Sequence, residues 1–218
     1  MIQLVNTADG SHTIYVPGID EHYHSIYGAV QESAFIFIKN GFEFCKANPV
    51  SILEIGFGTG LNALLTAVRS INGSREVNYT SIEKYPLDCK ITNSLNHYEF
   101  AGEKGKEIFS LIHSVPWNIS VNIFKYFNLK KIESDFTKVQ PSGKYDLIYF
   151  DAFGPDKQPE MWTSERFSGI SSVTNKDGIL VTYSAKGEVK RNLKACGFDV
   201  TLLQGPPGKR QMIRAVKI

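Results

Sequence analysis

Apolar runs typical of strands alternate along this chain with segments of helical periodicity. The continuous apolar run at residues 50–57 predicts a buried central strand. An apolar stripe with helical spacing comes directly after it, from Leu61 to about Arg69. Such alternation is typical of a mostly parallel sheet covered by helices, so the pattern predicts an α/β fold.

The later elements continue this order. Strands are expected at residues 77–83, 129–133, 145–150, 179–184, 199–203 and 212–218. Helices are expected after Pro86, at 97–128 with one or two breaks, at 159–173 and at 188–195. The turn at residues 205–208 would let the last strand run antiparallel beside its neighbour. The prediction is a Rossmann-like sheet of seven strands, mostly parallel, with an antiparallel last strand.

The N-terminal part has a different pattern. Residues 1–16 predict a short hairpin with Asp9-Gly10 at its turn, and residues 23–46 predict helices rich in aromatic side chains. No linker-like stretch separates these helices from the predicted central strand. We therefore expect residues 1–46 to form a hairpin and helical cap that belongs to the same domain as residues 47–218.

The amino-acid composition narrows the class of protein. Of 218 residues, 42% are hydrophobic and 21% charged, which suits a globular domain with a sizeable core. No bilayer-length apolar run or signal peptide is present, so we expect a cytoplasmic protein that does not bind membranes. The three cysteines lie far apart, which argues against disulfides and a metal site. The net charge is only +2, but the last third is rich in Lys and Arg, which indicates either a local basic face or solvated helix surface.

A glycine-rich loop, Gly56 to Gly60, lies between the central strand and the next helix. Glycines permit a tight turn and the close approach of a ligand. The dinucleotide fingerprint would need a glycine where Leu61 stands. The observed spacing is typical of nucleoside-binding class I methyltransferases, and Glu54 before the loop and Asn62 after it strengthen that interpretation.

Three acidic residues follow predicted strands. Glu83 ends the second strand, where a carboxylate can accept hydrogen bonds from both ribose hydroxyls. Asp135 follows the third strand, where it could accept from an adenine amine. Asp151 follows the fourth, at the edge that faces the ligand crevice in open α/β sheets. The alternatives are a surface glutamate for Glu83 and carboxylates that order their own loops for the two aspartates.

Residues 151–163, DAFGPDKQPEMWT, closely resemble the signature of the MnmC-like methyltransferases, D-[GA]-F-[AS]-P-x-x-N-P-E-M-W. Residues 56–62, 182–187 and 208–214 resemble the family's GFGTGLN, TYSAAG and GRKREML segments, and residues 20–33 carry its spaced N-terminal pattern. The departures from the family pattern are Gly154, Gln158 and Lys186.

The resemblance implies a Rossmann-like class I methyltransferase that uses S-adenosyl-L-methionine. It implies methylation of the 5-aminomethyl group of uridine 34, usually 2-thiolated, in the tRNA anticodon loop, with separate enzymes supplying the aminomethyl precursor. Bifunctional members continue into an oxidase, which we expect to be absent because the sequence ends at Ile218. The expected cofactor-binding residues are Glu54, Gly56, Gly58, Gly60, Asn62, Glu83 and Asp135.

The expected chemistry is attack by a neutral primary amine. Asp151 would hold the amine and accept its proton, beside an apolar wall formed by Phe153 and Pro155. Trp162 would either stack on a base or pack under the loop, and aromatic residues of the cap, Tyr23 and Tyr27, would either close over the donor or pack in the core. The candidate substrate contacts are Tyr183 and Ser184 for the uridine, and Lys186, Lys209 and Arg210 for phosphates, where solvated surface charge is the alternative.

Other functions stay open at this point. An aminopropyltransferase of the spermidine-synthase type shares the fold, but it would carry a second acid soon after Asp151, where Ala152, Phe153 and Gly154 stand. A methyltransferase of another amine also fits the residues. An RNA-binding module that has lost its cofactor is the alternative outside enzymes, and the intact glycines and acids argue against it.

Overall fold

The computed structural model describes residues 2–218 and is built around an eight-stranded sheet of order β10-β11-β9-β8-β4-β5-β7-β6. Neighbouring strands from β7 to β9 pair in parallel, and β11 runs antiparallel to both β9 and β10. This confirms the predicted fold class. The strands are β4 (Val50–Ile55), β5 (Val77–Glu83), β6 (Ser120–Phe124), β7 (Phe127–Glu133), β8 (Tyr145–Phe150), β9 (Thr174–Thr182), β10 (Phe198–Gln204) and β11 (Gln211–Lys217).

The prediction of seven strands was wrong by one edge strand. Strand β6 pairs antiparallel with β7 and lies in the segment predicted as broken helix. Only the 3-10 helix η2 (His97–Phe100) and helix α4 (Gly105–Ser114) of that segment are helical. The hairpin between β6 and β7 turns at Lys125-Tyr126, which is not a typical turn sequence, so the sequence contains no signal that separates two strands there.

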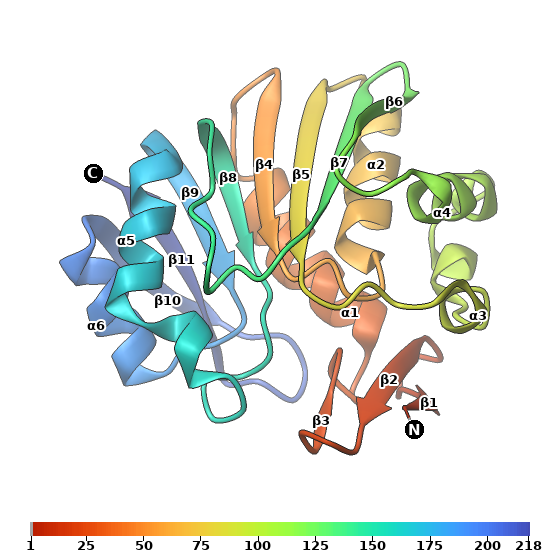
Figure 1. The fold of residues 1–218 in the computed structure, drawn as a ribbon, viewed down its shortest axis with the longest axis horizontal. Helices are drawn as coiled ribbons and strands as arrows, with labels where there is room; N and C mark the ends of the chain where they lie inside the picture. The colour runs from red at the N-terminus through yellow and green to blue at the C-terminus, as the bar shows by residue number, and fades with distance from the viewer. Residues whose placement is uncertain (1) are drawn as a thin grey trace.

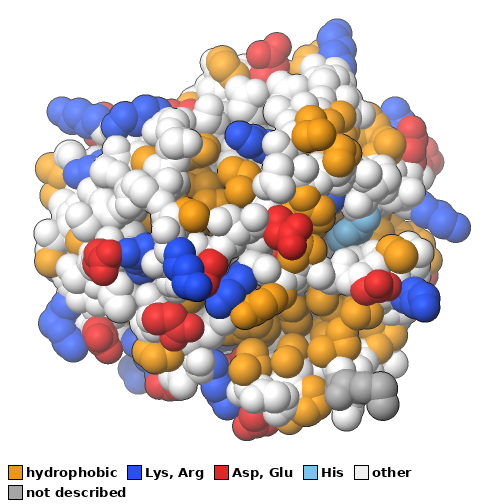
Figure 2. Space-filling view, viewed as in Figure 1, with side chains coloured by type: hydrophobic (Ala, Val, Ile, Leu, Met, Phe, Trp, Pro, Cys, Tyr) orange, Lys and Arg blue, Asp and Glu red, His pale blue; other side chains and the backbone are white. Residues whose placement is uncertain are grey.

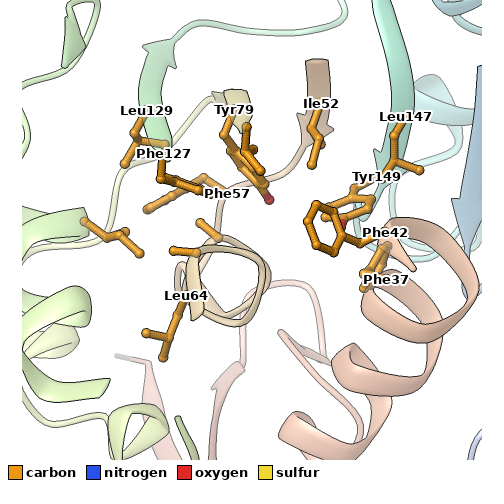
Figure 3. Close-up of a cluster of buried hydrophobic side chains, with 14 of the residues drawn as sticks. Phe37, Phe42, Ile52, Phe57, Leu64, Tyr79, Phe127, Leu129, Leu147 and Tyr149 are labelled. Carbon is orange, nitrogen blue, oxygen red and sulfur yellow. The ribbon is translucent and has the colours of Figure 1, made fainter. Parts of the chain in front are cut away.

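Helices cover both faces of the sheet (Figure 1). One face carries a π-helix η1 (Ala34–Phe42), α2 (Leu61–Gly73) and α4, and the other carries α5 (Ser164–Val173) and α6 (Gly187–Ala195). Figure 3 shows Phe37 and Phe42 of η1 packed beside Leu147 and Tyr149 of β8. The short helices are α1 (Ala29–Ser33), α3 (Cys89–Thr92) and η3 (Pro159–Trp162).

The N-terminal region forms a small sheet of β1 (Gln3–Asn6), β2 (His12–Val16) and β3 (Glu21–His22). Strands β1 and β2 pair antiparallel, while Met1 of the predicted hairpin lies outside the described residues. Figure 1 shows this sheet beside the edge where the central parallel strands end. A short hydrogen bond of 2.7 Å between His24 Nε2 and Thr59 Oγ1 joins the two regions.

Residues 34–42 were predicted as helix but not as a π-helix, and their side chains are more deeply buried than expected for a cap on the outside of the domain. Ile36, Phe37 and Ile38 are almost fully buried, and η1 packs against β8 and β9. None of the helices within residues 2–218 is both long and apolar enough to cross a bilayer.

Candidate functional site

A cavity of about 410 Å³ opens where β4, β5, β7 and β8 end. Its walls are the glycine loop, the segments that follow those strands, and residues 21–27 of the N-terminal region. This position, beyond the carboxyl ends of parallel strands, is the general ligand site of open α/β sheets. Its size lies within the range of about 300–1,000 Å³ for small-molecule sites.

The glycine loop is shaped by close backbone contacts. Gly56 has φ +92°, and a Cβ there would lie 2.5 Å from the carbonyl oxygen of Asp151. The Asp151 amide also donates to the carbonyl of Ile55 at 2.9 Å, so the segments after β4 and β8 run side by side. Gly58 has φ +50°, and a Cβ there would lie 2.9 Å from the Tyr23 ring. Both positions therefore require glycine, and Tyr23 covers the loop.

The Glu83 carboxylate faces the cavity in a fixed orientation. Its Oε2 accepts from the Gly58 amide at 3.0 Å and its Oε1 accepts from the Tyr85 amide at 2.8 Å. Each carboxylate oxygen can accept more than one hydrogen bond, so both oxygens can still accept from a ligand. Two acceptors held side by side in this way match the two hydroxyls of a ribose.

Asp135 lines the same end of the cavity. Its Oδ1 accepts from the amide of Thr137 at 3.0 Å and from its hydroxyl at 2.6 Å, and its Oδ2 lies 3.0 Å from Lys84 Nζ. The hydrogen bond from Thr137, and then that from Lys84, lower the pKa of Asp135 to about 2. Asp135 is therefore an ionised acceptor that an exocyclic amine could reach.

Asp151 is the acid at the other end of the cavity. Burial, and then the charge of Glu32, raise the pKa of Asp151 to about 7, against the opposing effects of an Asn62 hydrogen bond and of Lys209. Asn62 Nδ2 donates to Asp151 Oδ2 at 2.8 Å and to Glu54 Oε1 at 3.1 Å. A carboxyl with a pKa near neutrality, inside a cavity, is suited to exchange a proton with a ligand.

Glu54, Gly60 and Asn62 were predicted to bind the cofactor, but they are not among the residues that line the cavity. Glu54 is fully buried, accepts from Ser81 Oγ at 2.7 Å, and has its pKa raised by burial to about 8. Asn62 therefore holds Asp151 from behind the cavity wall and links it to the buried Glu54. Gly60, at φ +73°, begins helix α2, where a Cβ would lie 3.1 Å from the His113 and Phe57 rings.

The predicted substrate residues separate into two groups. Phe153, Tyr183 and Lys209 line the cavity, and the Tyr183 hydroxyl donates to the carbonyl of Ala152 at 2.7 Å. The other four do not line it. Ser184 is buried, Lys186 pairs with Asp156 on the surface, Arg210 is exposed, and Pro155 is half-buried.

Trp162 is part of the supporting core. It is buried, its Nε1 donates to the Phe153 carbonyl at 2.8 Å, and its ring packs on Phe150 with 4.9 Å between centroids. This places Trp162 under the loop that carries Phe153. Stacking on a base was the alternative, and the buried position of the ring disfavours it.

The N-terminal region contributes more of the cavity than the sequence indicated. Tyr23 packs edge-on against Phe153 with 5.0 Å between ring centroids, and burial together with the charge of Glu83 raises its pKa to about 12. Tyr27, for which core packing was the more frequent alternative, is exposed and lines the cavity. Glu32 also lines it; the pattern at residues 20–33 included this residue without a role. Met161, which lies in the signature segment at residues 151–163 but was given no role, and Tyr85, to which no sequence signal pointed, complete the wall.

Residues 121–218 match the family model described as S-adenosyl-L-methionine-dependent methyltransferase. The chain is 30% identical over 203 residues to the tRNA 5-methylaminomethyl-2-thiouridine biosynthesis bifunctional protein MnmC of Campylobacter hominis, covering 89% of this chain and 30% of that protein. It is also 30% identical over 210 residues to the MnmC protein of Leptospira interrogans, covering 89% and 32%. The chain thus spans about a third of the length of these curated relatives.

Two solved structures are similar over the whole chain. The crystal structure of MnmC2 from Aquifex aeolicus superposes with a TM-score of 0.79 at 28% identity, covering 99% of this chain and 70% of that one. Spermidine synthase from Thermotoga maritima superposes with a TM-score of 0.61 at 14% identity, covering 100% and 69%. At that identity, the second similarity concerns the fold alone.

Proposed function

Since this chain belongs to the S-adenosyl-L-methionine-dependent methyltransferases and uses that cofactor, we propose that it methylates the primary amine of 5-aminomethyl-(2-thio)uridine in the anticodon loop of tRNA. The relatives named above are tRNA 5-methylaminomethyl-2-thiouridine biosynthesis proteins, and the product in that name carries one methyl group on this amine. The observation that carries the proposal is the Asp151 carboxyl, with its pKa near 7, in the cavity beside the glycine loop.

The described residues fit the cofactor. Gly56 and Gly58 leave bare backbone at the end of β4, Glu83 presents two acceptors to a ribose, and Asp135 presents an ionised acceptor to an adenine amine. When bound there, S-adenosyl-L-methionine would supply a methyl group attached to a positively charged sulfur. The neutral thioether left after methyl transfer is a good leaving group. Glu83 and Asp135 lie at the donor end of the cavity, which leaves Asp151, Phe153 and Tyr183 for the substrate.

Asp151 acts on the amine in this proposal. An alkylammonium cannot attack, so one proton must leave the nitrogen before it can accept a methyl group. Asp151, with a pKa of about 7, accepts that proton and keeps the nitrogen hydrogen-bonded in one orientation. Phe153 and Tyr23 supply an apolar wall there, and exclusion of water favours the neutral amine.

The mouth of the cavity suits an unpaired nucleotide. Tyr27 and Tyr85 are exposed and line the cavity, so each can stack on a base. Basic and acidic side chains are intermixed on the face of the molecule that Figure 2 shows, which favours local phosphate contacts over a broad basic surface. Lys186, Lys209 and Arg210 remain our candidates for those contacts. The aminomethyl precursor would come from separate enzymes.

The test uses tRNA that carries the aminomethyl group and lacks the final methyl. The protein is incubated with this tRNA and labelled S-adenosyl-L-methionine, and the digested nucleosides are separated by mass spectrometry. We expect label only in 5-methylaminomethyl-2-thiouridine. Label in another nucleoside, or none while a small amine is methylated, would contradict the proposal. Decarboxylated donor with putrescine is the parallel assay for aminopropyl transfer, where we expect no spermidine.

Two variants connect the result to the site. Asp151→Ala should abolish turnover and keep the affinity for S-adenosylhomocysteine, measured by calorimetry, because Glu83 and Asp135 remain. Asp156→Ala is the matched control, since Asp156 belongs to the same loop but is exposed and pairs with Lys186 outside the cavity. Equal losses of turnover in both variants would mean that the loop, rather than the Asp151 carboxylate, is needed.

A further inference from the structure

The Lys209 side chain ends inside the substrate end of the cavity. Its Nζ lies 3.3 Å from Glu32 Oε1 and 4.6 Å from the centroid of the Tyr183 ring. A carboxylate beside an aromatic face is a favourable environment for an alkylammonium group. The protein's own ammonium group therefore marks a position in the cavity where such a cation is stabilised.

The Glu32 carboxyl is buried, and one of its two oxygens makes no hydrogen bond within the described residues. It is only 8% exposed, its Oε2 accepts from the Ser25 amide at 2.8 Å, and its Oε1 has no hydrogen-bond partner within residues 2–218. The Lys209 contact at Oε1 is an ion pair without hydrogen-bond geometry. A buried carboxylate oxygen is costly unless a cation or donor reaches it, and Lys209 is the cation that reaches Oε1 here, so a ligand ammonium would bind this oxygen by taking the place of Lys209.

Lys209 can leave its position without disturbing the core. It lies in the segment between β10 and β11, its side chain is 29% exposed, and it contacts the cavity from the mouth. The backbone of this segment is held separately. A Cβ at Gly208, where φ is +82°, would overlap the Tyr27 ring, so the ring lies directly on the Gly208 backbone. The Lys209 side chain can therefore turn to solvent while its backbone stays in place.

We propose that the Glu32 carboxylate and the Tyr183 ring face form the receptor for the ammonium group of the substrate, and that Lys209 occupies this receptor until the substrate displaces it. The proposal rests on the proposed amine methylation. It assigns Glu32 to recognition of the cation and leaves removal of the proton to Asp151, which lines the same cavity as Glu32 and Lys209. The substrate class is then a primary alkylammonium, and a neutral isostere is rejected.

The test compares a cationic ligand with a neutral one. The probes are 5-aminomethyluridine and 5-hydroxymethyluridine, with propylammonium as a third probe that contains no nucleoside. Binding is measured by calorimetry in the presence of saturating S-adenosylhomocysteine. Glu32→Gln should lower the affinity for the two amines by about tenfold and leave 5-hydroxymethyluridine unchanged. Lys209→Met should raise the affinity for the amines several-fold, because no internal cation competes.

Lys157→Met is the matched control. Lys157 matches Lys209 in side-chain exposure (30%) and in its distance to a carboxylate (3.4 Å to Asp20), but that carboxylate is exposed and Lys157 does not line the cavity. This variant should bind every probe like the wild type. Should Glu32→Gln fail to fold, Tyr183→Leu removes the ring face of the same receptor and should lower amine affinity, while Tyr183→Phe keeps it.

The outcomes separate this proposal from the proposed function. If Lys209→Met leaves amine affinity unchanged or lowers it, the Lys209–Glu32 pair only holds the segment in place and the receptor is wrong, even where the tRNA is methylated. If propylammonium responds to the variants as expected but the tRNA is not methylated, the receptor is right and the tRNA substrate is wrong. A preference for the amine that survives Glu32→Gln in a folded protein also overturns the receptor.

Discussion

Replacing Asp151 by Asn should remove activity and stabilise the protein at neutral pH. Burial and the Glu32 charge raise the pKa of Asp151 from 3.8 to about 7. A carboxyl that ionises less readily in the folded state than in the unfolded state opposes folding once it is ionised. Asn has nearly the same shape, can still accept from Asn62 Nδ2, and does not titrate.

The size of the effect follows from the two pKa values. The difference between 3.8 and about 7 corresponds to about 4 kcal/mol in the free energy of unfolding. Below pH 3.8 the carboxyl is protonated in both states and opposes nothing. The cost develops as pH rises from 3.8 and is complete above about pH 7. The Asn variant should therefore gain stability over wild type by up to about 4 kcal/mol across this interval.

Urea unfolding of both proteins at several pH values measures this difference. Asp156→Asn is the control, because Asp156 is 77% exposed and its surface ion pair contributes at most about 1 kcal/mol. We expect a pH-dependent gain for the Asp151 variant only. A stability difference that stays constant between acidic and neutral pH would show that Asp151 is not held at a raised pKa, and the proton-accepting role would lose its physical basis.

Three further predictions concern the same cavity. Glu83→Gln should weaken binding of S-adenosylhomocysteine by about 10- to 100-fold in calorimetry, since hydrogen bonds to a charged group are lost; an unchanged Kd would refute the ribose contact. Gly58→Val should block that ligand in a folded protein, because a Cβ there lies 2.9 Å from the Tyr23 ring at φ +50°; retained affinity would contradict this geometry. In the wild type, kcat should rise with pH up to about 7 and then level, because Asp151 must be ionised to accept a proton. Asn62→Ala should move this rise in kcat to higher pH, because the Asn62 hydrogen bond lowers the pKa of Asp151. If the rise stays at the same pH in the variant, Asn62 does not tune Asp151.

The central strand and the glycine loop could be predicted because their signals are local. Strand β4 covers most of the apolar run at residues 50–57, and Gly56, Gly58 and Gly60 all adopt positive φ, at +92°, +50° and +73°. Other side chains rarely adopt such angles, so the backbone conformation itself requires these residues. The ends of β5 and β8, with Glu83 and Asp151, follow from the same strand pattern.

The missed features depend on contacts between distant segments. Strand β6 is a five-residue edge strand whose partly exposed side chains give little periodicity, and only its pairing with β7 defines it. Residues 21–27 become cavity wall because Tyr23 lies on Gly58 and His24 bonds to Thr59. Local propensity contains no information on such contacts, so the sequence could identify the donor end of the site better than its cover.

Glu54 and Asn62 show that a sequence motif can identify a residue without identifying what its side chain contacts. Both flank the glycine loop and were assigned to the cofactor for that reason. In the structure neither residue lines the cavity, and Asn62 donates to the carboxyls of both Glu54 and Asp151. A motif therefore identified residues that serve the site but not the atoms that they contact.

The balance of charge at the substrate end explains why these residues occur together. Asp151 and Glu32 line one cavity, the fully buried Glu54 lies behind Asp151, and Lys209 is the cation that pairs with Glu32 there. Burial raises the pKa of both Asp151 and Glu54, so each of these two carboxyls opposes folding once it is ionised. A cationic substrate relieves that repulsion on binding, whereas a neutral one leaves Lys209 as the better partner. The destabilising acids and the selection of an ammonium group are thus one electrostatic property of the site.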